Sequence, residues 1–344
     1  MEVSSSYSSC SWSSLPDELL ELILNRLNNV LDIFRCLHVC SSWRLVATQC
    51  DVLTGAQQIN LPKAQDCWIC NSNNNGWLLT ISSLSFPYKV NLWNLISRNE
   101  IFLPSASKFP IFQCQRIQGF IKRCIISLSP SDPNCTVLVI FGIDSERKLA
   151  FCRPGDGEWK VLQDQVELSF VDIMFYEGQF YATDIRGKIY TCELGPNPKI
   201  IIAIEPPAQL YQTRQNYLVE SAAGDFLMFC KNWDWIDDDD EYVEVEDYIA
   251  ISFEVYKVDL GTREWRKLEN LGDEALFIGC NGRITASAST GNSGTAFSRG
   301  NCIYIINNSI EVNPDDDFEF KHASIYELES RSTKRLRTSE TSTS

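Results

Sequence analysis

Histidine is the side chain that most often performs acid–base chemistry near neutral pH, and this sequence contains two histidines. His38 falls in a segment that reads as helical, and His322 falls among the last predicted strands. Nothing in the sequence brings the two into one catalytic pair or one metal cluster. We therefore predict that the chain has no catalytic residues, binds no metal and carries no cofactor.

Cysteine is the second possible source of chemistry, with fourteen in the chain. The one CxxC pair, Cys67–Cys70, has no second pair and no histidine beside it, whereas a structural zinc site needs four ligands. The first residues, MEVSSSYSSCSWSS, lack the basic and apolar regions of a secretory signal. We therefore expect reduced, buried thiols in a protein of the cytoplasm, the nucleus or both. Typical single cysteines inside apolar runs are Cys124, Cys192, Cys230 and Cys302.

The acidic run DDDDEYVEVED (237–247) is dense in oxygen ligands. Calcium loops of the EF-hand type alternate their ligands and need a glycine at the sixth position, and this run does neither. It reads as a solvated loop between strands, with a contact for a basic partner as the alternative. Trp233 and Trp235, just before it, suit partner binding and packing at a sheet edge equally well.

The net charge and hydropathy of the chain limit the partners that it can have. The sequence has 45 acidic and 30 basic residues, a formal net charge of −15 and an isoelectric point of about 4.7. Nonspecific nucleic-acid binding depends on Lys and Arg neutralising phosphates, so this charge argues against it. No apolar run approaches the ~20 residues that span a bilayer. We predict neither a nucleic-acid partner nor a membrane partner.

Residues 15–50 read as three short helices, which follow a Ser-rich segment, residues 1–14, that we expect to be disordered. The first helix, in LPDELLELILNRL (15–27), is apolar on two sides. One row is Leu19, Ile23 and Leu27, and the other is Leu20, Leu24 and Leu31. A helix that covers a single core needs only one such stripe. The second row therefore packs either on the rest of this chain or on another protein.

From about residue 57 to residue 337 the apolar period changes from 3.6 to 2, which is typical of strands. Short apolar runs such as TVLVIFGI (136–143) and GQFYATD (178–184) are bounded by Gly, Asn, Asp or Pro. No long helical pattern intervenes, so we expect antiparallel sheets throughout. Residues 338–344 read as a disordered tail.

One degenerate hairpin recurs along this region. YKVDLGTREWRKL (256–268) aligns with LAFCRPGDGEWKVL (149–162), VNLWNLISRNEIFLP (90–104) and SIYELESRSTKRL (324–336). The turns fall near residues 97, 155, 261 and 331, which indicates a repeat of very roughly 50 residues, as in kelch-like propeller blades. Five units of about four strands follow, at 66–104, 117–162, 170–207, 217–268 and 276–337. We predict a β-propeller of five to six blades.

The helical segment resembles an F-box, whose pattern starts with Leu-Pro, continues through an acidic Leu/Ile-rich helix and ends in Val-Cys-x-x-Trp. Ser41 departs from the pattern, because many members carry a basic residue there. The resemblance implies a small all-α F-box of three helices that docks on a Skp-family adaptor. The adaptor-binding residues that it implies are Leu15, Pro16, Leu19, Leu20, Ile23, Leu24, Leu27, Phe34, Val39, Cys40 and Trp43.

The remainder resembles the propeller of the plant-expanded F-box family with a KIB-type, kelch-like C-terminal domain. The resemblance rests on KLAFCRPGDGEWKVL, YEGQFYATDIRGKIYTCEL and VYKVDLGTREWRKLENLGDEALFIG, and on GNCIYI near the end. It implies a non-catalytic substrate receptor of an SCF-type cullin–RING ubiquitin ligase, in which the propeller binds an unknown substrate protein. An F-box scaffold that sequesters a partner outside any ligase is the alternative.

The size of the helical segment agrees with a partner for the second apolar row. Roughly 35 residues have too little volume to bury two rows by themselves. Placing one row in a groove of an adaptor is helix-in-groove recognition. Four or five apolar anchors at ~1.5–3 kcal/mol each outweigh an association cost of several kcal/mol.

Overall fold

The fold was obtained as a computed structural model. The structure describes residues 15–24, 67–71, 76–82, 86–94, 97–109, 119–143, 146–162, 168–208, 210, 215–234, 250–279, 283–287, 300–308 and 321–336. The second and third predicted helices, the two predicted disordered ends and the acidic run 237–247 lie outside these residues. In the part that is described, no helix has the length and apolarity needed to cross a lipid bilayer.

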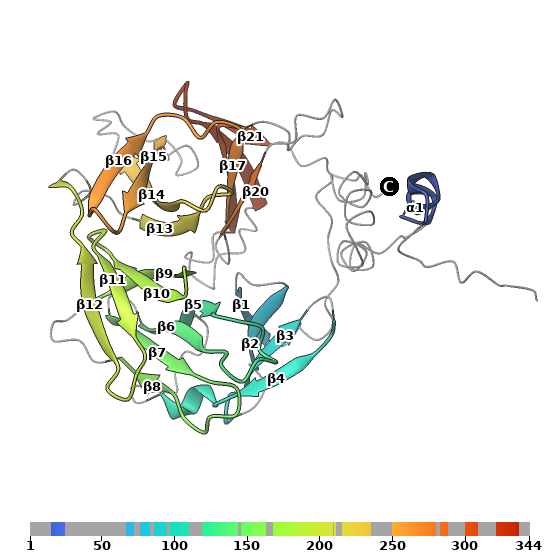
Figure 1. Ribbon diagram of the computed structural model, residues 1–344, viewed down its shortest axis with the longest axis vertical. Helices are drawn as coiled ribbons and strands as arrows, with labels where there is room; N and C mark the ends of the chain where they lie inside the picture. Colours follow the sequence, from blue (N-terminus) through green and yellow to red (C-terminus); the bar gives the residue numbers. More distant parts are fainter. Residues whose placement is uncertain are drawn as a thin grey trace, which may run out of the picture.

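Strands dominate the described residues, and they form five sheets that follow one another around a ring in chain order (Figure 1). The first sheet contains β1 (Cys67–Asn71), β2 (Trp77–Ser82), β3 (Val90–Asn94) and β4 (Glu100–Leu103). The second contains β5 (Ile121–Ile126), β6 (Val137–Ile143), β7 (Glu146–Cys152) and β8 (Lys160–Val161). The third contains β9 (Phe170–Tyr176), β10 (Gln179–Asp184), β11 (Ile189–Glu193) and β12 (Lys199–Ile204).

The last two sheets complete the ring. The fourth contains β13 (Gln215–Glu220), β14 (Phe226–Asp234), β15 (Ala250–Asp259) and β16 (Glu264–Leu268). The fifth contains β17 (Glu274–Gly279), β18 (Arg283–Ser287), β19 (Cys302–Asn308), β20 (Lys321–Glu327) and β21 (Ser332–Leu336). Each sheet corresponds to one of the five units predicted from the sequence, although β13 and β17 each begin two residues before the predicted unit. We number these sheets as blades 1 to 5.

Blades 1 to 4 are antiparallel meanders, so that the turns after their first and third strands share one face of the ring. Contacts between β1 and β5, between β5 and β9, and between β9 and β13 place the first strand of each of these blades on the inside. The outer strands are therefore β4, β8, β12 and β16.

The fifth sheet contradicts the expectation of purely antiparallel, four-stranded sheets. Its order is β18-β17-β19-β20-β21, and β17 pairs with β19 in parallel. The chain turns back from β17 into β18 and returns at Gly300, beside the start of β17, where the Asn301 amide donates to the Glu274 carbonyl at 2.8 Å. A Cβ at Gly300 would lie 2.6 Å from the Gly272 carbonyl oxygen. Glycine therefore permits the close return that makes the two strands parallel.

The hydrophobic core consists of layers between neighbouring blades. One apolar cluster joins blades 1 and 2 through residues such as Leu92, Phe109 and Phe141. Further clusters join blades 2 and 3, blades 3 and 4, and blades 4 and 5. Blades 2, 3 and 4 thus bury both faces against their neighbours, which is the reason that their middle strands read as nearly continuous apolar runs.

Candidate functional site

The described part of the helical segment is α1 (Asp17–Leu24), which begins directly after Leu15 and Pro16. The Pro16 carbonyl accepts from the amides of Leu19 at 3.0 Å and Leu20 at 3.2 Å, which closes the first turn. Asp17 lies at the positive end of the helix, where a carboxylate is favourable. The Leu-Pro start therefore fixes where the helix begins.

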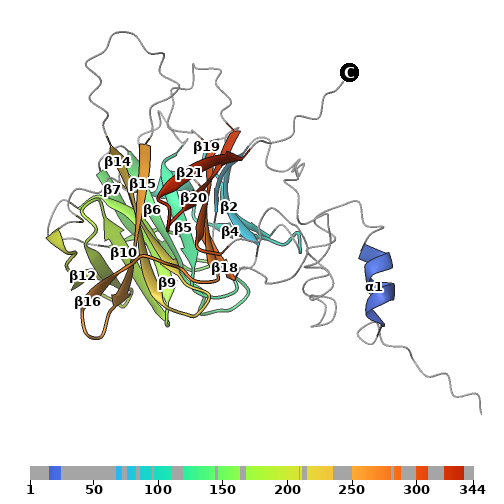
Figure 2. The same cartoon turned by 90° about the horizontal axis from the view of Figure 1, so that it is seen from above.

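The two apolar rows of α1 have different environments. Leu20 and Leu24 are 0% and 1% exposed, so the chain itself covers them. Leu19 is 46% exposed and Leu22 is 58% exposed. Ile23 is half-buried beside them. The helix therefore has one covered face and one open apolar face, and in Figures 1 and 2 it lies outside the ring of sheets.

The predicted adaptor-binding residues divide accordingly. Leu19 and Ile23 lie on the open side with half-buried Leu15 and exposed Pro16, whereas the side chains of Leu20 and Leu24 are turned into the chain. The structure therefore gives the two rows of α1 different surroundings and brings the first row to the surface. Outside the described residues lie Leu27, Phe34, Val39, Cys40 and Trp43.

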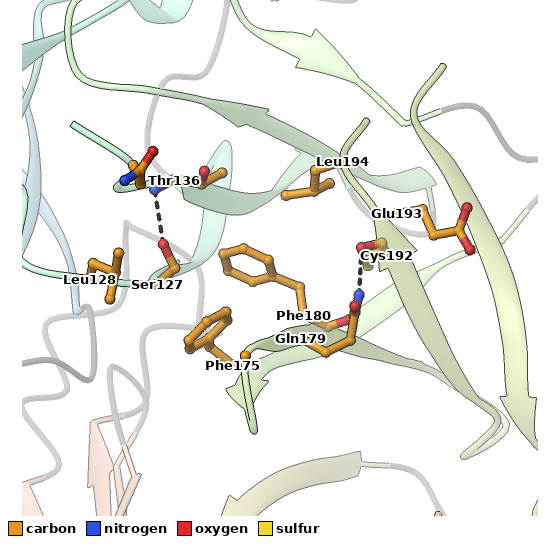
Figure 3. A pocket seen from close by; sticks show the side chains of 11 residues that line it. Ser127, Leu128, Thr136, Phe175, Gln179, Phe180, Cys192, Glu193 and Leu194 are labelled. Carbon is orange, nitrogen blue, oxygen red and sulfur yellow. Dashed lines mark hydrogen bonds between the residues drawn. The ribbon is translucent and has the colours of Figure 1, made fainter. Parts of the chain in front are cut away.

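The propeller has an open hollow of about 480 Å³ where blades 2 and 3 meet (Figure 3). Its apolar lining is Leu128, Phe175, Phe180 and Leu194, and the Phe175 and Phe180 rings are tilted with centroids 4.7 Å apart. The polar lining is largely held by the fold. Ser127 Oγ accepts from the Thr136 amide at 3.0 Å, and Gln179 Nε2 donates to the Cys192 carbonyl at 2.8 Å.

The buried thiols of the propeller are unsuited to nucleophilic chemistry. Burial raises the pKa of Cys192 to about 12, and it raises the pKa of Cys70 to about 12 although the nearby Arg123 charge opposes the shift. These thiols are protonated near neutral pH, and the thiolate is the reactive form. Cys67 and Cys70 are three residues apart on β1, so their side chains point to opposite faces of the strand. Of the eight described cysteines, seven are buried and Cys67 is half-buried.

A buried carboxylate links three successive blades near the inside of the ring. Asp172 on β9 is fully buried, and its Oδ2 accepts from the Leu218 amide of β13 at 2.6 Å. Its Oδ1 lies 3.8 Å from Nε of Arg123 on β5. The charged Arg123 on one side and the Leu218 amide on the other stabilise the buried carboxylate in this position. Asp172 therefore has a structural explanation that requires no substrate.

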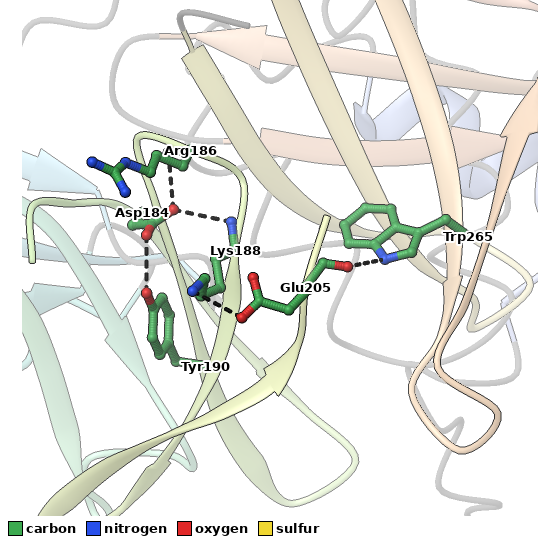
Figure 4. A network of polar contacts seen from close by, with 6 residues as sticks. All are labelled: Asp184, Arg186, Lys188, Tyr190, Glu205 and Trp265. Carbon is green, nitrogen blue, oxygen red and sulfur yellow. Dashed lines mark hydrogen bonds and ion pairs between the residues drawn. The ribbon is translucent and has the colours of Figure 1, made fainter. Parts of the chain in front are cut away.

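A second polar network holds the turn between β10 and β11 (Figure 4). Asp184 Oδ1 accepts from the amides of Arg186 at 2.9 Å and Lys188 at 3.0 Å, and Oδ2 accepts from the Tyr190 hydroxyl at 2.9 Å. Burial and then the Asp184 carboxylate raise the pKa of the Tyr190 hydroxyl well above its usual range. Lys188 Nζ also pairs with Glu205 Oε1 at 2.9 Å. Since Asp184 fixes backbone amides, the network positions a turn and contains no free acid–base pair.

The recurring Glu-Trp hairpins connect neighbouring blades. Trp159 Nε1 donates to the Pro104 carbonyl at 2.8 Å, and Trp265 Nε1 donates to the Glu205 carbonyl at 2.9 Å. Pro104 directly follows β4, and Glu205 directly follows β12. The two tryptophans thus make equivalent bonds to the outer edge of the preceding blade.

Comparison with protein-family models identifies the propeller. A model described as the KIB1-4 beta-propeller matches residues 36–327. The chain belongs to this family. A second model, described as F-box-like, matches residues 12–53, which include α1 and its Leu-Pro start. The KIB1-4 propeller of this chain is therefore preceded by an F-box-like segment.

Relatives of known sequence agree with this assignment. The chain is 32% identical over 330 residues to the putative F-box protein At5g55150 of Arabidopsis thaliana, an alignment that covers 87% of this chain and 86% of the relative. It is 25% identical to F-box protein At2g26160 of the same plant, over 81% of this chain and 91% of the relative. F-box protein SKIP23, also from Arabidopsis thaliana, is 24% identical over 81% of this chain and 80% of its own.

Solved structures add nothing to the functional assignment. TolB from Acinetobacter baumannii aligns with a TM-score of 0.39 and 12% identity, over 79% of this chain and 54% of its own. At this level of similarity the alignment supports no argument about the KIB1-4 propeller. The fold therefore rests on its own sheets and on the family match.

Two features of the site were missed in the sequence analysis. Leu22 has the most exposed of the described leucine side chains of α1, yet neither predicted row included it. Its spacing of i+3 from Leu19 is the signal that could have found it, because residues three apart share a helix face. The role of the Glu-Trp dipeptide was also missed, although its recurrence at Trp159 and Trp265 was recognised.

Proposed function

We propose that this chain is the substrate-recognition subunit of an SCF-type cullin–RING ubiquitin ligase. In this proposal the F-box docks on a Skp-family adaptor and the KIB1-4 propeller binds the substrate protein. The chain is then a non-catalytic subunit that contributes proximity and orientation, while a ubiquitin-conjugating enzyme performs the chemistry. The F-box-like match and the F-box names of the relatives support the first half of this proposal.

The observation that carries the proposal is the open apolar face of α1. Two leucines, Leu19 and Leu22, are about half exposed on a helix whose opposite row is fully covered. Fully burying an exposed leucine side chain contributes about 1.5–3 kcal/mol, so a groove that covers these two half-exposed side chains contributes about the same amount in total. Exposed apolar residues gathered on one face of a helix are typical of helix-in-groove binding.

The covered row has a different role in this proposal. Leu20 and Leu24 are enclosed by the chain, so they hold α1 in place and present Leu19 and Leu22 outward. Replacing a covered leucine by alanine costs about 2–5 kcal/mol of folding free energy. Variants of the covered row would therefore lose binding through unfolding, and only variants of the open row test docking directly.

Adaptor binding by an open-row variant tests the first half of the proposal. We expect L19E/L22E to bind a purified Skp-family adaptor at least roughly 100-fold more weakly than the unchanged chain, because two apolar anchors are lost and two carboxylates would have to be desolvated in their place. The matched control is F102E on β4 of the propeller, whose Phe102 is also a highly exposed apolar residue. F102E should bind the adaptor normally. Unchanged affinity of L19E/L22E, with both variants folded, would reject the docking proposal.

Ubiquitination of a captured partner separates the ligase from the scaffold alternative. Proximity labelling with the L19E/L22E chain identifies propeller partners that are no longer passed to the ligase. For a substrate receptor, ubiquitination of such a partner rises with the level of the unchanged chain and not with the level of L19E/L22E. A scaffold would bind the partner without changing its ubiquitination.

A further inference from the structure

The hollow between blades 2 and 3 has apolar side chains at its base, and these can be reached from the surface. Phe180 belongs to the buried layer between the two blades, and Phe175 and Leu194 are partly buried against that layer. Leu128 on the β5–β6 connection is 42% exposed at the side of the hollow. The core between blades 2 and 3 thus reaches the surface at this place instead of being capped by polar side chains (Figure 3).

All the elements that line the hollow belong to one face of the ring. Residues 127–136 join the first and second strands of blade 2, and the β9–β10 turn joins the first and second strands of blade 3. The end of β11 lies at the same face, because the third turn of an antiparallel meander returns to the side of the first. The hollow is therefore formed by connections between strands, which are the parts of a scaffold that carry binding residues.

The polar groups of the hollow are suited to a peptide backbone. Gln179 donates its amide N–H to the Cys192 carbonyl, which holds the side chain and leaves its carbonyl oxygen as an acceptor. Ser127 accepts from the Thr136 amide and retains a hydroxyl proton to donate. Asn134, on the same connection as Ser127, supplies an exposed side-chain amide. These groups can pair with the N–H and C=O of an extended segment whose side chain enters the apolar floor.

The charge around the hollow is acidic. Glu193 lines it, and the exposed Glu177 precedes Gly178 of the lining in the β9–β10 turn. Among the described residues, no lysine or arginine pairs with Glu177, and the cation paired with Glu193 is Lys199, at 3.1 Å. The connection SLSPSDPNCT (127–136) adds Asp132 and no basic residue. A ligand that carries positive charge beside its apolar anchor is therefore favoured.

We propose that this hollow binds a segment of the substrate protein in which an aromatic or aliphatic anchor is flanked by lysine or arginine. The anchor enters between Leu128, Phe175 and Leu194, and the flanking cations lie beside Glu177 and Glu193. The proposal rests on the proposed function only in calling the bound protein a substrate. Peptide binding to the hollow requires no adaptor, so it can fail or succeed independently of docking by α1.

Selection from a randomised twelve-residue peptide display library tests the proposal, with the folded full chain as bait. The unchanged chain should enrich peptides that carry an apolar anchor next to Lys or Arg. L128K should lose this enrichment, because it places a charge beside the apolar floor. The matched control is I143K, because Ile143 is 38% exposed at the end of β6, on the opposite face of the same blade. I143K should enrich the same peptides as the unchanged chain.

A charge reversal identifies the acidic side of the hollow. E177K/E193K should still select an apolar anchor, but with Asp or Glu in place of Lys or Arg. A synthetic peptide of the unchanged chain's consensus should bind this variant roughly tenfold or more weakly. No enrichment by the unchanged chain, the same consensus with L128K, or an unaltered charge preference with E177K/E193K would each overturn the proposal.

Discussion

Replacing Trp159 and Trp265 by phenylalanine compares one hydrogen bond in two environments. Both indoles donate to a carbonyl just beyond the outer strand of the preceding blade. Trp159 is 5% exposed and Pro104 is buried, whereas Trp265 is half-buried and Glu205 is exposed. Water can therefore replace the indole at Glu205 but not at Pro104, so the two substitutions should have unequal costs.

The expected costs follow from this difference in burial. W159F leaves a buried carbonyl without its donor, which costs about 1–3 kcal/mol. It also removes roughly 40 Å² of buried apolar surface, which adds about 1 kcal/mol. The stacking of Trp159 on Phe109, at 4.8 Å between centroids, indicates that little empty space exists to relax into. W265F should cost at most about 1 kcal/mol, because solvent satisfies the Glu205 carbonyl.

Thermal unfolding followed by circular dichroism measures the difference. At roughly 2–4 °C per kcal/mol for a domain of this kind, W159F should lower Tm by roughly 4 to 16 °C and W265F by about 4 °C or less. Isothermal urea unfolding should give the same ranking. If W265F destabilised the chain as much as W159F, burial would not set the cost and the reasoning would be refuted.

Three further substitutions or modifications test other parts of the account. D172N should destabilise the chain by about 2–4 kcal/mol in urea unfolding, because it removes a buried charge that links three blades; a loss below 0.5 kcal/mol, on the order of a surface change, would contradict the linking role. The G142A protein should fail to fold or should aggregate on expression, because a Cβ at this position would lie 2.0 Å from a backbone oxygen. G155A has open space at its Cβ, so this protein should fold with a modest loss of stability. Equal behaviour of the two variants would contradict the packing argument. Burial raises the pKa of Cys70 to about 12, so this thiol should stay protonated and unmodified by iodoacetamide at pH 8 until urea is added. Half-buried Cys67 should be alkylated first, as followed by peptide mass spectrometry, and the reverse order would contradict the burial of Cys70.

The sequence predicted the propeller well because its signal is repeated. Turns expected near residues 97, 155, 261 and 331 coincide with left-handed backbone at Arg98, Gly155, Arg263 and Arg331. One recurring hairpin therefore located four outer strand pairs at once. The third blade has no copy of this hairpin, and its unit, 170–207, was placed from the spacing, because the 106 residues between the turns near 155 and 261 hold two repeats.

The rearranged fifth blade could not be predicted in the same way. The parallel pairing of β17 with β19 depends on where the chain returns after β18, and the close approach at Gly300 is a tertiary contact. Alternation of apolar residues gives strand positions but not the direction of the neighbouring strand. A glycine that looks like part of a Gly/Ser-rich loop was in fact required by that return.

The candidate site divides into a local part and a tertiary part. The F-box-like segment was recognised from short-range spacing, since Leu-Pro and the two leucine rows are local features. Which row is covered depends on what packs against α1, and the sequence does not state this. The hollow beside Leu128 was missed entirely, because its lining comes from two blades and only the ring brings these connections together.

The most direct test of the central claim is the affinity of the full chain for a purified Skp-family adaptor, measured by calorimetry for the unchanged chain, L19E/L22E and F102E. The account predicts tight one-to-one binding for the unchanged chain and F102E, and a loss of at least roughly 100-fold for L19E/L22E. Equal binding by all three folded proteins, or no binding by the unchanged chain, would contradict the claim that the open face of α1 is a docking surface.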